Sequence, residues 1–291
     1  MFIALSYILV VLIWGSSWIA ITYQYGIVPD ELSVSYRFFI ASLCLFITCK
    51  AKKESIGISL KNYPMIILMG STMFCFNYLF TYYGMHDVVS GLAAILFSLM
   101  VMSNAFFEKL FFGRTVENRI IAAAIIGIIG LILIFFTEIN EQANNIDTIY
   151  GVSWLLVAVL ISSLGNMTAI VNINRGIPII KANAHAMLWG SIISFAVAII
   201  LGKPIVFDSN PSYIFSLIYL AVAASAITFV CYLILIREIG STRTAYTSLL
   251  FPVVALIIST MAGEYSWSLY SLIGVIFILF GTWLALPKIT K

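Results

Sequence analysis

Long apolar segments, separated by short connections, recur along the sequence and restrict the chain to a membrane-embedded fold. A helix needs about 20 apolar residues to cross a bilayer core about 30 Å thick. Segments close to that length lie near residues 2–22, 33–49, 64–83, 90–111, 119–136, 151–172, 185–202, 213–236, 244–262 and 269–286. Only 9% of the residues are charged, against about 25% in an ordinary soluble domain. We therefore predict an all-α membrane protein with ten transmembrane helices.

The distribution of Lys and Arg between alternate loops predicts the orientation in the membrane, because basic loops stay in the cytoplasm. One side would collect thirteen basic residues, namely Lys50, Lys52, Lys53, Lys61, Lys109, Arg114, Arg119, Arg175, Lys181, Arg237, Arg243, Lys288 and Lys291. The other side would hold Lys203 alone, while Arg37 lies within an apolar segment. This asymmetry predicts that both termini are cytoplasmic.

The two halves of the chain are similar to each other. At a spacing of 154 residues, "STMFCFNY" (71–78) aligns with "SAITFVCY" (225–232), and "ILFS" (95–98) aligns with "LLFP" (249–252). We therefore predict two five-helix repeats, residues 1–137 and 149–287. Because five is odd, the second repeat would be inserted upside down relative to the first, and inverted repeats of this kind are typical of transporters.

Four motifs occur in order along the chain. They are "IWGSSW" in the first segment, "YRFFIAS" in the second, "LLFPVVALIISTMAGE" through the ninth and "LIGVIFILFGTWL" in the tenth. With this order, topology and repeat, nearly the whole chain resembles the drug/metabolite transporter superfamily, specifically its ten-helix EamA-like members. The first half departs from the pattern, since Ser98 stands opposite Pro252, and Arg114 follows Gly113 where Glu264 follows Gly263.

This resemblance implies a secondary transporter in the cytoplasmic (inner) membrane of a bacterium, with a central cavity and no nucleotide to drive it. We expect it to export a small, partly apolar metabolite, such as an aromatic or other amino acid, by alternating access. The sequence has no GxxxxGK[ST] phosphate loop, no Ser/His/Asp order, no HExxH and no GxSG. We therefore expect no enzyme; the alternative is a non-transporting membrane scaffold or an undetected intramembrane enzyme.

The expected partners are a small-molecule substrate and the lipid bilayer, and the chain would be a monomer or a homodimer. Its basic residues are spread over loops, which argues against nucleic acid. The four cysteines lie in apolar segments without CxxC or His-plus-Cys spacing. We accordingly expect no metal and no cofactor.

Hydroxyl-bearing and aromatic side chains occur at helical spacing in the third and eighth segments. They are Ser71, Cys75, Tyr78 and Tyr82 in the third segment and Ser225, Phe229 and Tyr232 in the eighth. Hydroxyl groups at mid-depth are costly when they face lipid, so we expect both sets to line the central cavity and bind substrate. Ordinary aromatic packing is the alternative.

Ser16 in the first segment and Asn166 in the sixth are further candidate substrate contacts. Each lies beside a glycine, which would allow the helix to distort and expose backbone groups to a ligand. A hydrogen bond between helices is the alternative. Pro252 removes one backbone hydrogen bond from the ninth segment, so we expect a hinge there.

Arg37 and Glu108 are charged residues within or beside apolar segments. Arg37 lies near the outer end of its predicted helix, where it could reach the headgroups or pair with Asp30 or Glu31. We expect this anchoring role; contact with an anionic group of the substrate is the alternative. Glu108 could carry a coupling proton or simply pair with Lys109.

Overall fold

The computed structural model describes residues 2–88, 93, 96–115, 117–134, 136, 146–261 and 267–285. Every regular element in these ranges is a helix. The elements are α1 (Phe2–Thr22), α2 (Asp30–Ala51), η1 (Leu60–Asn62), α3 (Tyr63–Ser71), η2 (Thr72–Phe76), α4 (Asn77–Met85), α6 (Met100–Phe112), α7 (Asn118–Ile134), α9 (Ile146–Asn174), α10 (Ile179–Ile200), α11 (Pro211–Ala221), η3 (Val222–Ile227), α12 (Thr228–Ile239), α13 (Ser241–Thr244), α14 (Thr247–Met261) and α15 (Leu269–Ala285).

Six of the described helical stretches are long and apolar enough to cross a membrane. They are Ile3–Thr22, Asp30–Ala51, Leu60–Met85, Ile146–Asn174, Ile179–Ile200 and Pro211–Ile239. Two shorter apolar helices, Asn118–Ile134 and Leu269–Leu284, accompany them. The described part of the chain therefore confirms the predicted all-helical membrane class.

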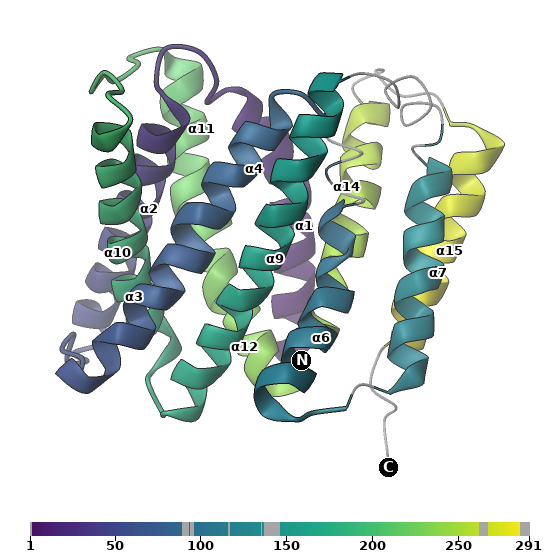
Figure 1. Cartoon of the computed structure of the whole chain (residues 1–291), viewed down its shortest axis with the longest axis horizontal. Coiled ribbons are helices and arrows are strands. Elements are labelled where there is room, and N and C mark those ends of the chain that lie inside the picture. The colour runs from purple at the N-terminus through teal and green to yellow at the C-terminus, as the bar shows by residue number, and fades with distance from the viewer. Residues whose placement is uncertain are drawn as a thin grey trace.

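The helices stand side by side in one bundle and alternate in direction along the chain (Figure 1). The connections after α2 and α9 lie at one end of the bundle, and those after α1 and α10 lie at the other. As a result α1 and α9, the first long helices of the two halves, run in opposite directions (Figure 1).

Most of the close helix pairs join one half of the chain to the other. α2 packs along α10, α4 along α9, α1 along α14, and α7 along α15. The α7–α15 pair stands at one side of the bundle (Figure 1). The two halves are therefore interdigitated in the described structure.

Glycines bring α7 and α15 into backbone contact. A Cβ atom added to Gly130 would lie 2.6 Å from the carbonyl oxygen of Gly274, and one added to Gly274 would lie 2.5 Å from that of Gly130. Two turns further along, a Cβ on Gly281 would lie 2.7 Å from the Ala123 carbonyl oxygen. Small residues at helix interfaces in lipid allow this approach, and the gain comes from close packing.

Two of the long helices contain a π-helical turn near their middle. Thr72–Phe76 (η2) interrupts the helix formed by α3 and α4, and Val222–Ile227 (η3) interrupts the one formed by α11 and α12. A π turn is rare and is found mostly as a single bulge within an α-helix, often at a functional site. The two bulges lie in the third and the eighth of the predicted segments.

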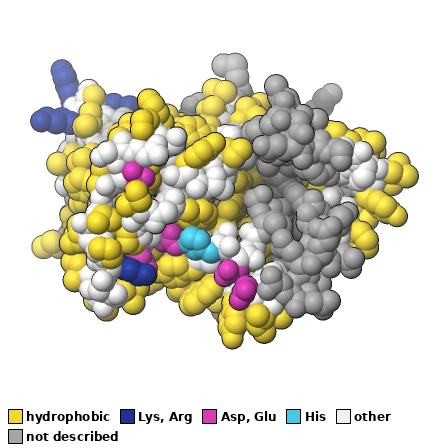
Figure 2. Space-filling model, turned by 90° about the horizontal axis from the view of Figure 1, so that it is seen from above, with side chains coloured by type: hydrophobic (Ala, Val, Ile, Leu, Met, Phe, Trp, Pro, Cys, Tyr) yellow, Lys and Arg dark blue, Asp and Glu magenta, His cyan; other side chains and the backbone are white. Residues whose placement is uncertain are grey.

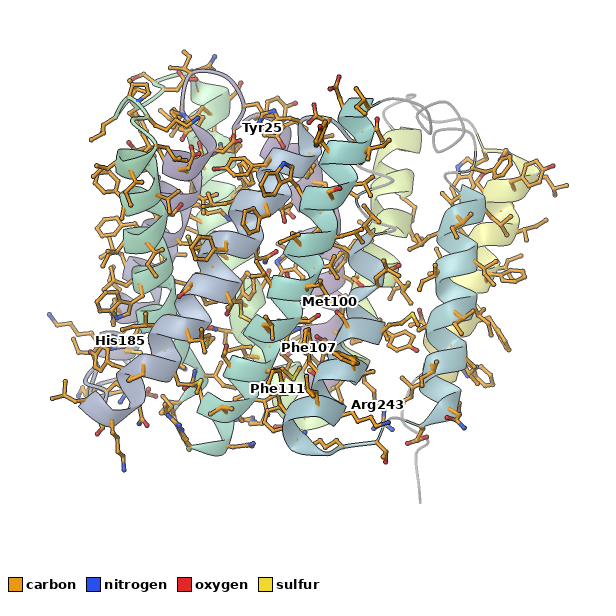
Figure 3. The ribbon with its side chains drawn as sticks, viewed as in Figure 1. Tyr25, Met100, Phe107, Phe111, His185 and Arg243 are labelled. Atoms are coloured by element: carbon orange, nitrogen blue, oxygen red, sulfur yellow. The ribbon has the colours of Figure 1, made fainter. Side chains whose placement is uncertain are left out.

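The two ends of the bundle differ in charge. Figure 2 looks onto the end that carries Tyr25 in Figure 3, where Asp and Glu side chains gather near one histidine on a largely hydrophobic face. There the Nε2 atom of His86 lies 2.8 Å from a carboxylate oxygen of Asp30. Arg243 lies at the opposite end of the bundle (Figure 3); its guanidinium contacts Glu117 at 3.0 Å.

Candidate functional site

A cavity of about 90 Å³ lies between the helices of the bundle. Met100, one of its lining residues, stands at mid-height between Tyr25 and Arg243 (Figure 3). The described lining residues come from both halves of the chain and are Trp14, Ser17, Trp18, Ile21, Arg37, Met73, Asn77, Tyr78, Thr81, Phe97, Met100, Ser162, Asn166, Phe229, Tyr232 and Phe251. The cavity thus occupies the position at which a transporter with two repeats would bind its ligand.

Aromatic rings form much of the cavity wall. The ring of Trp14 on α1 lies 4.9 Å from Phe229, 4.9 Å from Tyr232 and 5.6 Å from Phe251 between centroids. These separations are typical of edge-to-face and tilted aromatic pairs, which hold one another in place. The wall is therefore largely flat, apolar and fixed by packing.

The η3 bulge supplies polar anchors for this wall. The indole Nε1 of Trp14 donates to the carbonyl oxygen of Ala224 at 2.8 Å, across 210 residues of sequence. Thr228 Oγ1 donates to the Ala223 carbonyl oxygen at 2.7 Å. Because a π turn disturbs the regular i to i−4 hydrogen bonds, its carbonyl groups can accept these side-chain donors.

Arg37 is the only charged residue among the described lining residues, and its side chain is only 1% exposed. Its Nε atom donates to Ser225 Oγ at 2.8 Å, and Nη2 donates to the Tyr78 hydroxyl at 3.4 Å. Its Cζ atom lies 4.5 Å from the centre of the Tyr78 ring. The Tyr82 hydroxyl lies near the guanidinium but does not meet hydrogen-bonding geometry. The Nη1 atom of Arg37 has no hydrogen-bond partner among the described residues.

The expected anchoring of Arg37 by outer carboxylates is wrong. Asp30 pairs with His86 instead, and Glu31 accepts a hydrogen bond from the Tyr83 hydroxyl. The prediction failed because it assumed that the guanidinium would reach toward the membrane surface. Ser225, which is 188 residues away in sequence, holds it in the interior instead.

A chain of side-chain hydrogen bonds leads from the cavity toward the end that carries Arg243. Asn166 Nδ2 donates to the Tyr232 hydroxyl at 3.1 Å and to Asn104 Oδ1 at 3.2 Å. Asn104 Nδ2 in turn donates to the Ser241 carbonyl oxygen at 3.1 Å. The chain joins α9, α6, α12 and α13, and each of these neutral groups gains a partner that lipid could not supply.

Glu108 lies at the far end of this chain and is 7% exposed. Its Oε1 atom accepts hydrogen bonds from the Ser241 hydroxyl, from the Thr242 backbone N–H at 3.2 Å and from Thr242 Oγ1 at 3.3 Å. It therefore ties α6 to the start of α13, and these contacts are not with Lys109. A role in carrying a coupling proton stays a prediction. A second hollow, of about 450 Å³, is lined by Glu108, Arg114, Glu117 and Arg243, among others.

The predicted site residues fall into two groups. Arg37, Tyr78, Asn166, Phe229 and Tyr232 line the cavity, and Ser225 contacts it through Arg37. The other four lie outside the described wall. Ser16 hydrogen-bonds with the Tyr219 hydroxyl at 2.7 Å, and Ser71 donates to the Ile67 carbonyl oxygen within its own helix. Cys75 lies beside Ser194, and Tyr82 packs on Tyr25. Pro252 lies outside the residues whose side chains the structure describes, so its hinge role stays a prediction.

Several lining residues were missed by the sequence analysis. They include Trp14, Trp18, Asn77, Thr81 and Ser162. Trp14 and Trp18 belong to the motif "IWGSSW", which had been used only for the resemblance. Asn77 was the clearer signal, because an amide within an apolar segment needs a polar neighbour or a cavity.

The arrangement defines a polytopic helical membrane protein with a central cavity. The profile of the EamA-like transporter family matches residues 1–136 and 149–286. The chain belongs to this family, and it is a multi-pass protein of the bacterial inner membrane.

Several relatives span almost the same length. Protein PagO of Salmonella typhimurium is 26% identical, with 98% of this chain and 92% of PagO aligned. The transporter YoaV of Bacillus subtilis is 24% identical, with coverages of 87% and 86%. The inner membrane transporter YedA of Escherichia coli K12 is 25% identical, with coverages of 87% and 80%. A solved crystal structure shares the fold with a TM-score of 0.81 at 17% identity, covering 97% of this chain and 96% of that one.

Proposed function

We propose that this protein is a secondary transporter that moves a small metabolite across the inner membrane by alternating access. The observation that carries the proposal is the cavity, which lies at mid-height and is lined by helices from both halves. A site between two halves can be opened to either side when one half moves relative to the other. A scaffold would have no need for such a cavity.

The proposed topology has ten transmembrane helices in two inverted five-helix repeats, with both termini in the cytoplasm. Three findings support it: the two separate matches of the family profile, the opposite directions of α1 and α9, and the paired π turns η2 and η3. In this orientation the end carrying Arg243 is cytoplasmic, and the acidic end that carries His86 faces outward. The hollow at Glu108 would then be the cytoplasmic entrance.

The proposed cargo is a small, partly apolar metabolite such as an aromatic amino acid, and the proposed direction is export. The aromatic wall around Trp14 supports an apolar portion of the cargo, and the amides of Asn77 and Asn166 support a polar portion. The family profile and the transporter names of YoaV and YedA support transport in general.

Counterflow into proteoliposomes tests the proposal, with one matched pair of variants on α9. Ser162 is buried in the cavity wall, whereas Ser153 is exposed on the outer surface of the same helix. We expect saturable flux, stimulated by substrate on the opposite side, in the native protein and in Ser153→Trp. We expect none in Ser162→Trp, because the indole would fill the cavity.

Two results would contradict transport through this cavity. The first is the absence of flux by the native protein across a broad panel of amino acids and metabolites, which would favour a scaffold or an enzyme. The second is equal flux by Ser162→Trp and Ser153→Trp, which would place the pathway elsewhere.

A further inference from the structure

We propose that the cavity recognises its cargo by a single carboxylate, which binds the Arg37 guanidinium, and that the cargo is a monocarboxylate with a flat apolar tail. We further infer that an amino group on the cargo is dispensable. The inference rests on the proposed transport function in taking this cavity as the transport site.

Arg37 gives the described cavity wall a positive charge. Taking a guanidinium out of water is costly unless opposite charge and hydrogen bonds compensate for it. Arg37 has only neutral neighbours: it donates to the Ser225 and Tyr78 hydroxyls, and it lies near the Tyr82 hydroxyl and the rings of Tyr78 and Phe38. None of the ion pairs formed by the described residues includes Arg37. The protein therefore holds one positive charge at the cavity without a counter-charge on its described wall.

The guanidinium of Arg37 has N–H donors that the described residues do not fully use. Ser225 takes the Nε–H, which fixes the plane of the guanidinium. Nη2 makes only a long contact to Tyr78, and Nη1 makes none with the described residues although it is buried. A carboxylate bound by two parallel N–H donors is the partner that such a planar fork matches. One cation compensates one negative charge, so a monoanion fits better than a dianion.

Aromatic rings form much of the cavity wall apart from Arg37. Trp14 with Phe229 and Phe251, and Trp18 with Phe97 at 5.7 Å, present ring faces and edges to the cavity. Rings hold a flat apolar group by stacking and by edge-to-face contact. The volume of about 90 Å³ limits this tail to a small group.

The described cavity wall offers no negative charge to an amino group on the cargo. An ammonium group that leaves water needs a carboxylate or several acceptors. The described wall has no Asp or Glu, and its polar side chains besides Arg37 are neutral, such as those of Asn77, Thr81 and Asn166. An amino group would thus meet neutral acceptors but no opposite charge on the described wall, so it should add little to the affinity.

A ligand series on the native protein tests the proposal directly. Trp14 and Trp18 line the cavity, so their fluorescence can report binding of 3-phenylpropanoate, L-phenylalanine, 3-phenylpropanamide and 2-phenylethylamine. We expect 3-phenylpropanoate to bind at least as tightly as L-phenylalanine. The amide and the amine should bind about 10 to 100 times more weakly, the range for loss of a hydrogen-bonded charge. Equal affinity for the carboxylate and its amide would overturn the proposal.

Variants assign the recognition to Arg37. Arg37→Gln should bind the carboxylate and the amide equally, and Arg37→Lys should keep part of the preference because it retains the charge and loses the fork. The control is Arg175→Gln, which removes an exposed arginine from the connection after α9 and should leave both affinities unchanged. A full carboxylate preference in folded Arg37→Gln would contradict the proposal. If that variant does not fold, the ligand series decides.

Flux measurements separate this inference from the transport proposal. Preferential binding of 3-phenylpropanoate without counterflow of any metabolite would refute transport and leave the carboxylate site standing. Counterflow of neutral or cationic compounds, without preference for carboxylates, would refute the carboxylate site and leave transport standing.

Discussion

Replacing either glycine of the α7–α15 contact with alanine should force the two helices apart. The new Cβ on Gly130 would lie 2.6 Å from the Gly274 oxygen, whereas ordinary contact begins at 3.4 Å, so α7 must retreat by about 0.8 Å. The nearest atom is a backbone carbonyl oxygen, which cannot turn aside as the end of a side chain could. A gap of this size forfeits about a quarter to a half of the dispersion energy of the contacts it opens.

The expected loss of stability follows from these terms. Overpacking costs about 1–3 kcal/mol and the opened interface adds to it, while alanine gains about 1 kcal/mol over glycine in helix propensity. We therefore expect Gly130→Ala and Gly274→Ala each to destabilise by about 1–3 kcal/mol, or about 3–10 °C in the unfolding midpoint. In the double variant the second alanine uses space that the first has opened, so its cost should be smaller by about 0.5–3 kcal/mol.

Thermal unfolding in detergent, at one heating rate for all variants, measures these shifts. The control is Gly57→Ala, where the nearest atom to the new Cβ is Ser55 Oγ at 3.7 Å; its midpoint should change by the equivalent of less than about 1 kcal/mol. Native-like midpoints for Gly130→Ala and Gly274→Ala would refute the backbone contact. Full additivity in the double variant would show that the two glycines do not share one gap.

Three other predictions concern the rest of the bundle. Glu108→Ala should lower the unfolding midpoint more than Glu108→Gln does, and the difference should correspond to about 1–3 kcal/mol. The reason is that glutamine retains an acceptor for the buried donors of α13. Equal midpoints of the two variants would contradict this role. Trp14→Phe should destabilise by about 1–3 kcal/mol because the Ala224 carbonyl group loses its indole donor, and an unchanged midpoint would argue against that bond. Single cysteines in a cysteine-free background should react with an impermeant reagent on intact cells within residues 138–148 and stay unlabelled within 50–61; the reverse pattern would overturn the proposed orientation.

The class of fold was readable from the sequence because apolar length and loop charge are local properties. The cavity wall was only partly readable. The predicted face in the third segment assumed a regular helix, in which each residue turns the face by about 100°. The π turn at Thr72–Phe76 inserts extra backbone between Ser71 and Tyr78, so only Tyr78 of that face reaches the cavity.

The contacts that define the site lay beyond local reasoning altogether. Arg37 meets Ser225 across 188 residues, and Asn104 meets Ser241 across 137. No spacing rule connects positions so far apart in the chain. What the sequence could offer was the presence of amides and a guanidinium within apolar segments, each of which must find a partner somewhere.

The pairing of helices across the two halves has a consequence for biosynthesis. The ribosome delivers α2, α4 and α7 well before α10, α9 and α15, the helices along which they pack. At about 5–20 residues per second, the 188 residues between Arg37 and Ser225 take about 10–40 s to translate. During that interval the guanidinium has no serine to hold it in the interior, and its favourable place is the hydrated membrane surface. Until the second half is inserted, the first half therefore lacks the contact that holds Arg37 in the interior.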